Sequence, residues 1–184
     1  SSATPDGDFY WICVGYDTLG RKKLIADRNI QHTISWDTLN TSGAVFGRDI
    51  DIDGLPWTCT LRLLSGGVNS NDKYNEWDKI IAESSLNGLI TPGDDAIWNW
   101  TSSTYSNSKT TRAIRACSTG AASPVGVDAY NWVVSSDAIS SRGYRPALLV
   151  LSTPKINNVY ISKTNLWNND IQNINLTAII SNEV

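Results

Sequence analysis

Residues 143–151 read GYRPALLVL, and this stretch contains one of the longest apolar runs of the chain, Ala147 to Leu151. A short apolar run bounded by turn residues is typical of a buried strand. We therefore expect Tyr144–Leu151 to close a domain, and Thr153-Pro154 to mark its boundary. This predicts one domain over residues 1–152, followed at 153–184 by a β-hairpin appendage, a linker or a truncated Ig-like module.

Strand patterns recur on the N-terminal side of this closing strand. Residues 9–16 (FYWICVGY) are aromatic and β-branched and end at a turn, so residues 22–27 are expected to return as a hairpin partner. Residues 49–53 alternate strictly between Asp and Ile, Asp53-Gly54 is a hairpin turn signal, and residues 57–64 alternate again. The sequence therefore predicts two antiparallel hairpins.

Two short helices are expected between and after these hairpins. Residues 35–40 begin with Ser35, a residue type that caps helices, and stop at Ser42-Gly43. Residues 76–82 place Trp77, Ile80 and Ile81 at helical spacing. Two short helices packed on small antiparallel sheets predict an α+β fold.

The segment 87–142 has a different texture, rich in Ser, Thr, Asn, Gly and Asp with single aromatic residues between them. Only short strand candidates occur in it, at 97–100, 111–117 and 130–134. We expect long irregular loops there, and long loops in a compact domain are often functional.

The composition is that of a folded globular protein and excludes several partners. Of the 184 residues, 41% are hydrophobic and 18% charged, and the net charge is −3 without a basic run. Nucleic acid is therefore not an expected partner, and no apolar run reaches the roughly 20 residues that membrane insertion requires. The three cysteines show no metal-binding spacing, so we expect Cys13, Cys59 and Cys117 to be buried apolar side chains.

The motifs together resemble a group of clostridial and phage-associated proteins with a C-type-lectin-like fold in its broad form. That form also includes formylglycine-generating enzymes and the variable proteins of diversity-generating retroelements. The resemblance spans roughly residues 9–151, and it implies a C-type-lectin-like α+β domain with a long loop-rich segment. The matching motifs are residues 25–28 (IADR), 34–37 (ISWD), 51–54 (DIDG), 62–67 (RLLSGG), 75–78 (NEWD), 98–100 (WNW) and 143–148 (GYRPAL).

The chain departs from two branches of that fold. It lacks the disulfides and the paired calcium motifs of animal C-type lectins, so calcium-dependent sugar binding is not expected. Formylglycine-generating enzymes need reactive cysteines late in the fold, where Cys117 stands alone. No cofactor is expected.

Other groups that could carry chemistry have a structural explanation. The pattern Asp49-x-Asp51-x-Asp53-Gly54 matches half of a calcium loop, but the twelfth position is Thr60. A strand with solvated carboxylates that ends in an Asp-Gly turn explains the whole pattern. His32, the single histidine, is expected to be a polar surface residue, and no nucleophile elbow is present. Asp94-Asp95 follows Pro92-Gly93 and indicates a turn, with paired acids or a cation site as the alternative.

Aromatic and amide side chains in the segment 87–142 form the predicted binding surface, because flat rings anchor ligands and Asn supplies adaptable hydrogen bonds. Within Trp98-Asn99-Trp100, at least one tryptophan should belong to the core, and Trp98 is favoured. Arg145, in the closing strand, is expected to be a buried structural residue. The candidate ligand-binding residues are Trp100, Tyr105, Asn107, Tyr130, Trp132 and Arg142.

These patterns favour a non-catalytic recognition domain of a phage tail, a virion or a bacterial surface. Its expected partner is a cell-surface glycan or protein receptor, and because weak sites gain from multivalency, a homo-oligomer is expected. A purely structural virion or surface-assembly subunit, whose loops contact neighbouring subunits, is the alternative.

Overall fold

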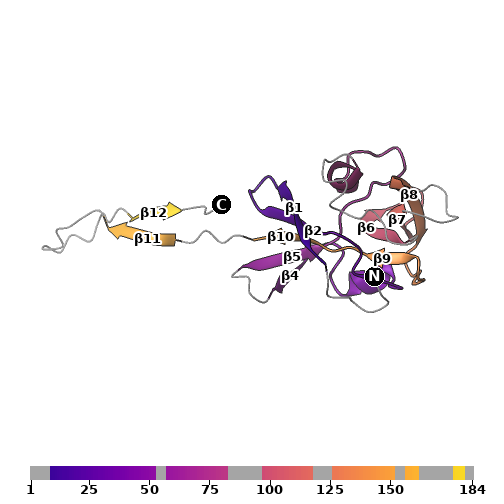
Figure 1. Cartoon of the computed structure of the whole chain (residues 1–184), viewed down its shortest axis with the longest axis horizontal. Helices are drawn as coiled ribbons and strands as arrows, with labels where there is room; N and C mark the ends of the chain where they lie inside the picture. Colours follow the sequence, from indigo (N-terminus) through magenta and orange to yellow (C-terminus); the bar gives the residue numbers. More distant parts are fainter. Residues whose placement is uncertain are drawn as a thin grey trace, which may run out of the picture. The chain divides into compact units, whose positions relative to one another are not determined.

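The chain divides into two compact units, Ser1–Leu151 and Ser152–Val184 (Figure 1). The computed structural model describes residues 9–52, 57–82, 97–117 and 126–151, with backbone alone at 117 and 126–128, and the backbone of strands 156–161 and 176–180. In the second unit, β11 (Ile156–Ile161) and β12 (Leu176–Ile180) pair antiparallel. In the described part of the chain, no helix has the length and apolar character needed to span a membrane.

The first unit is a mixed α+β structure in which two five-stranded sheets carry most of the regular structure. In the first sheet, every neighbouring pair is antiparallel. The hairpins expected at residues 9–27 and 49–64 are both present there, although residues 53–56 at the second turn lie outside the described part. Its strand order is β1 (Trp11–Tyr16), β2 (Lys22–Ala26), β10 (Ala147–Val150), β5 (Thr58–Arg62) and β4 (Arg48–Asp51).

The second sheet contains most of the described part of segment 87–142. The strands expected at 97–100, 111–117 and 130–134 are all present, at 98–104, 111–117 and 126–134. Two of them are longer than expected, so in the described residues strands replace much of the irregular loop that was expected. Residues 101–104 are four polar residues in a row, and Trp98 to Thr101 are buried on both faces of their strand, so the sequence shows no contrast between a buried and a solvent-exposed face there. Its strand order is β3 (Gln31–His32), β9 (Arg142–Tyr144), β6 (Trp98–Thr104), β7 (Thr111–Cys117) and β8 (Gly126–Val134), with β6 and β9 parallel.

Both predicted helices are present and short. The α-helix α1 (Trp36–Thr41) is capped by Ser35, whose side chain accepts a hydrogen bond from the backbone N–H of Thr38 at 3.1 Å. Its apolar side packs Trp36 and Leu39 into a core with Trp98, Trp100 and Ile114 of the second sheet. The second is a π-helix, η1 (Asp78–Ala82), whose Ile80 and Ile81 pack with Trp77 and with Ile25 of the first sheet.

The stretch 143–151 forms two strands in two different sheets, where one continuous strand was expected. Tyr144 ends β9 in the second sheet and Ala147 begins β10 in the first, so Arg145-Pro146 carries the chain across. Proline cannot donate a ladder hydrogen bond, which accounts for the break at this point.

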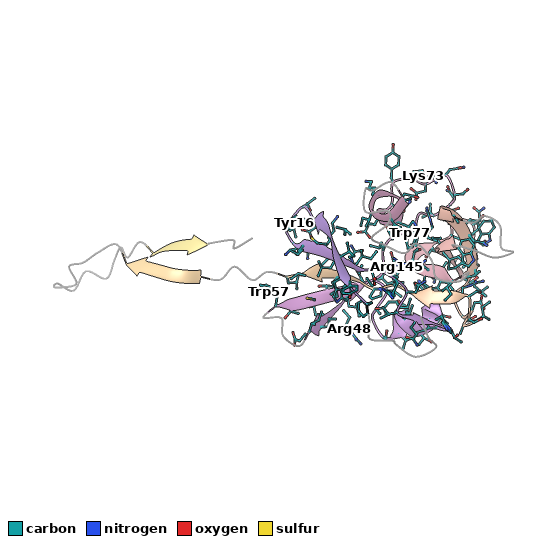
Figure 2. All side chains as sticks on the ribbon, in the orientation of Figure 1. Tyr16, Arg48, Trp57, Lys73, Trp77 and Arg145 are labelled. Carbon is teal, nitrogen blue, oxygen red and sulfur yellow. The ribbon has the colours of Figure 1, made fainter. Side chains whose placement is uncertain are left out.

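Arg145 is buried at this crossing, as expected of a structural residue, and is 2% exposed. Its Nε donates to Asn99 Oδ1 at 3.0 Å, and its Nη1 donates to the backbone carbonyls of Ala26 at 3.4 Å and Asp27 at 3.2 Å. The guanidinium carbon lies 5.9 Å from the Trp77 ring centre. Figure 2 labels Arg145 and Trp77 in the interior of the unit, where the two sheets meet.

The expectation for the cysteines is met in part. Cys59 is buried, but Cys13 is exposed, because β1 is an edge strand whose Ile12 and Val14 face the core while Cys13 points to the other side. The side chain of Cys117 lies outside the described residues.

We predict that Arg145→Ala lowers the free energy of unfolding by about 3 kcal/mol or more, because each buried acceptor left without its donor costs about 1 to 3 kcal/mol. Urea unfolding of the whole chain at neutral pH measures this. The matched control is Arg48→Ala, since Arg48 is exposed on β4 and its loss should cost less than about 1 kcal/mol. Equal losses in the two variants would contradict the role given to Arg145.

Candidate functional site

The structure brings four of the six predicted binding residues together: Tyr105, Asn107, Tyr130 and Trp132. The rings of Tyr105 and Trp132 stack with centres 4.5 Å apart and planes 3° from parallel. Trp132 is 46% exposed and Tyr105 is half-buried. We call these two stacked side chains the ring pair, and they are the centre of the candidate site.

Strand geometry explains why these rings meet. Trp132 on β8 lies opposite Ala113 on β7, and the backbone N–H of Tyr105 donates to the carbonyl of Thr111 at 3.1 Å where β6 turns into β7. Ala113 is fully buried and small. Its side chain leaves room above β7 for the two rings to stack.

Asn107 and the turn around it hold the tyrosine in place. The side-chain amide of Asn107 lies on the surface and donates to the Tyr105 hydroxyl at 3.3 Å. The backbone N–H of Ser106 donates to the Val68 carbonyl at 2.9 Å, which fastens this turn to the loop that follows β5. An amide and hydroxyls therefore border the ring pair.

Tyr130 supports the ring pair from below, and its expected role as an exposed ligand contact needs correction. It lies on the same face of β8 as Trp132, with ring centres 6.5 Å apart, but it is only 7% exposed. Its hydroxyl lies 3.5 Å from the Gly67 carbonyl, and burial raises its pKa to about 12. The loop at Gly67 covers Tyr130 and leaves Trp132 open.

The other two predicted residues do not join the site. Trp100 is 2% exposed, and its Nε1 donates to the Ile34 carbonyl at 2.7 Å, so it belongs to the core together with Trp98. Arg142 is half-buried on β9, where its Nε lies 3.2 Å from Asp137 Oδ2. In the strand order, β6 and β7 separate β9 from Trp132.

A buried ion pair that the sequence did not single out anchors the floor of the site. Arg115 of β7 forms a two-pronged pair with Asp78 of η1, and its Nη1 also donates to the Gly66 carbonyl at 2.9 Å. Arg115 is 1% exposed, and its guanidinium carbon lies 5.6 Å from the Tyr130 ring centre. The 62–67 and 75–78 motifs contain Gly66 and Asp78, but no local pattern indicates their partner on β7.

Gly66 must be glycine for a steric reason. A Cβ built at this position would lie 2.5 Å from Cγ2 of Thr101 on β6. The backbone therefore approaches the sheet closely here, and only a residue without a side chain allows it.

A second, more exposed ion pair fastens the start of η1 to the first sheet. Arg62 of β5 donates from Nη1 and Nη2 to the two carboxylate oxygens of Glu76, at 2.6 and 2.5 Å, and the backbone N–H of Ser65 donates to Glu76 Oε2 at 3.1 Å. Burial alone would raise the pKa of Glu76, but the Arg62 guanidinium and this N–H outweigh it and hold that pKa below its ordinary value.

The other candidate groups take structural roles where the structure describes them. Asp49 and Asp51 accept hydrogen bonds from the hydroxyls of Thr60 and Thr58 across the β4–β5 pair, at 2.8 and 3.2 Å. His32 Nδ1 lies 2.7 Å from the Thr33 hydroxyl. Among the described residues, no cluster of three or more acidic, His or Cys side chains could hold a metal ion. Asp94-Asp95 lies outside that part of the chain.

Comparison of the chain with protein-family models, with curated proteins and with solved structures finds no match. The mixed α+β architecture, with two sheets and two short helices in the first unit, is what the structure shows. The more specific C-type-lectin-like assignment stays a prediction from the sequence motifs.

We predict that Glu76 stabilises the fold in a pH-dependent way. Its pKa in the folded chain lies below the ordinary value of 4.5, so its stabilisation is complete above that value and is lost as the pH falls through the folded pKa. The difference in unfolding free energy between wild type and Glu76→Gln should therefore be present at pH 7 and shrink below about pH 4. Urea unfolding at a series of pH values measures it, and a difference independent of pH would contradict the assignment.

Proposed function

We propose that the first unit is a non-catalytic recognition domain of a phage virion or a bacterial surface, which binds a cell-surface glycan or protein through the ring pair of Tyr105 and Trp132. The observation that carries this proposal is the stacked, half-exposed geometry of the two rings. A large aromatic surface that remains in water is the kind of group that becomes an energetic anchor when a partner covers it.

The rigidity of the site supports a binding role. The ring pair rests on Ala113 and Tyr130, which are buried, and Asn107 holds the tyrosine hydroxyl. A side chain that is ordered before binding loses little conformational entropy when the ligand arrives. The pair is therefore suited to act as a preformed anchor.

The carboxylate of Asp72, in the loop that contacts Ser106 and Tyr130, accepts hydrogen bonds from the backbone of that loop. Asp72 Oδ2 accepts from the Val68 N–H at 3.1 Å, and its Oδ1 accepts from the Tyr74 N–H at 3.2 Å. Both oxygens thus shape the loop that contacts Ser106 and Tyr130. This arrangement fits a surface built for contact better than one built for proton transfer.

We predict that Trp132→Ala weakens binding to receptive cells at least about 30-fold, the loss typical of a central aromatic anchor. Tyr105→Ala should weaken it by a similar or smaller factor, because Trp132 then loses its stacking partner. Labelled protein incubated with a panel of clostridial and other Gram-positive cells, and counted by flow cytometry, provides the measurement.

Trp57→Ala and Tyr16→Ala are the matched controls. Both residues are exposed and belong to the first sheet region, as Figure 2 shows, and both variants should bind as wild type does. Equal losses in the controls and in Trp132→Ala would argue against a dedicated site. A stable homo-oligomer that buries the ring pair, with no binding to any cell, would favour the structural-subunit alternative.

A further inference from the structure

We propose that the ligand of the ring pair is a sugar ring of a cell-surface glycan, stacked on the open face of Trp132 without any metal ion. This inference rests on the proposed recognition function and narrows its ligand to one chemical class. Three features support the inference: the orientation of the indole, the polar groups beside it, and a backbone N–H at the neighbouring sheet edge that is already hydrogen-bonded.

The orientation of the indole leaves a flat surface open. One face of Trp132 is covered by Tyr105, since the ring planes are 3° from parallel at 4.5 Å. The side chain is 46% exposed, and because Tyr105 lies against one face, we assign this exposure to the other face and the edges of the indole. The face of an aromatic ring is electron-rich and attracts positively polarised C–H groups, which a pyranose presents as a flat patch of matching size.

The groups beside the rings supply the hydrogen bonds that a sugar needs. Asn107 and Ser106 are exposed next to Tyr105, and an amide and a hydroxyl can each donate and accept. Sugar hydroxyls also donate and accept, so they match such groups better than a charged or a purely apolar ligand does. The polar border begins at the Tyr105 hydroxyl itself, 3.3 Å from Asn107 Nδ2.

The edge of β8 disfavours the simplest protein ligand, an added strand. β8 is the outer strand of the second sheet, and the pairing with β7 leaves the backbone of Trp132 at that edge. The N–H of Trp132, however, already donates to the side-chain oxygen of Asn131 at 2.8 Å. An incoming strand would have to displace this hydrogen bond, which adds a cost to strand addition at this position.

The decisive experiment treats receptive cells before the labelled full chain is added. Periodate cleaves vicinal diols of sugars, and a protease removes surface proteins. We expect periodate to abolish binding and protease to leave it unchanged, with a chelator having no effect. Polysaccharide purified from the same cell wall should compete with the cells for wild-type protein, whereas a Trp132→Ala variant should bind that polysaccharide at least about 30-fold more weakly, as it does the cells.

A second variant separates a sugar from a protein surface. Val134 is 51% exposed on the same face of β8, two residues beyond Trp132. A sugar stacked on the indole leaves Val134→Ser close to wild type, whereas a protein interface, which covers about 800 Å² on each partner, would extend over it and be weakened. Asn107→Ala should weaken glycan binding about three- to tenfold.

The outcomes distinguish the two levels of the proposal. Binding that resists periodate and is lost on protease treatment overturns the glycan inference and leaves the recognition function standing. Wild-type protein that binds no cell and no cell-wall polysaccharide overturns both. Equal binding by wild type and Trp132→Ala, with Trp57→Ala as control, shows that any glycan is bound elsewhere and also overturns the inference.

Discussion

The buried guanidinium of Arg145 is the contact on which the arrangement of the first unit depends. A charge taken out of water is costly unless hydrogen bonds replace the lost solvation, and here the partners come from β6 and from the end of β2. These partners belong to different sheets, so satisfying one side chain holds both sheets in register. The same demand explains Asn99, a fully buried amide in a strand whose neighbours are tryptophans.

Arg115 is a second buried arginine, and it lies opposite Asn99 on the same face of the second sheet. Its hydrogen bonds connect the interior of the unit to the candidate site at the surface. Its pairing with Asp78 and with the Gly66 carbonyl fixes η1 and the loop after β5 against the strands. That loop covers Tyr130 through Gly67 and meets Ser106 through Val68, and both lie beside the ring pair. The exposed rings are thus supported by a buried polar network, which accounts for their fixed orientation.

Local patterns predicted the elements better than their packing. Alternation predicted the β4–β5 hairpin, and Ser35 predicted the start of α1, because both depend on neighbours in sequence. Tyr130 and Trp132 share a strand face, yet one is covered and the other open, since the loop at Gly67 comes from 63 residues away. Trp100 lies two residues from Trp98 and therefore on the same strand face, in the core. The polar residues around it suggested an exposed surface, but residues 98–101 are buried on both faces of the strand. Local periodicity cannot predict which side chains a segment from a distant part of the chain will cover.

The crossing at residues 142–150 also affects how the protein is made. β10 is the central strand that joins the β1–β2 and β4–β5 hairpins, and it comes from the last residues of the first unit. During synthesis both hairpins leave the ribosome before the strand that unites them, with the inner edges of β2 and β5 open. A chain that stops short of Ala147 would therefore be prone to aggregate, and recombinant versions of this unit need their C-terminal boundary beyond Leu151.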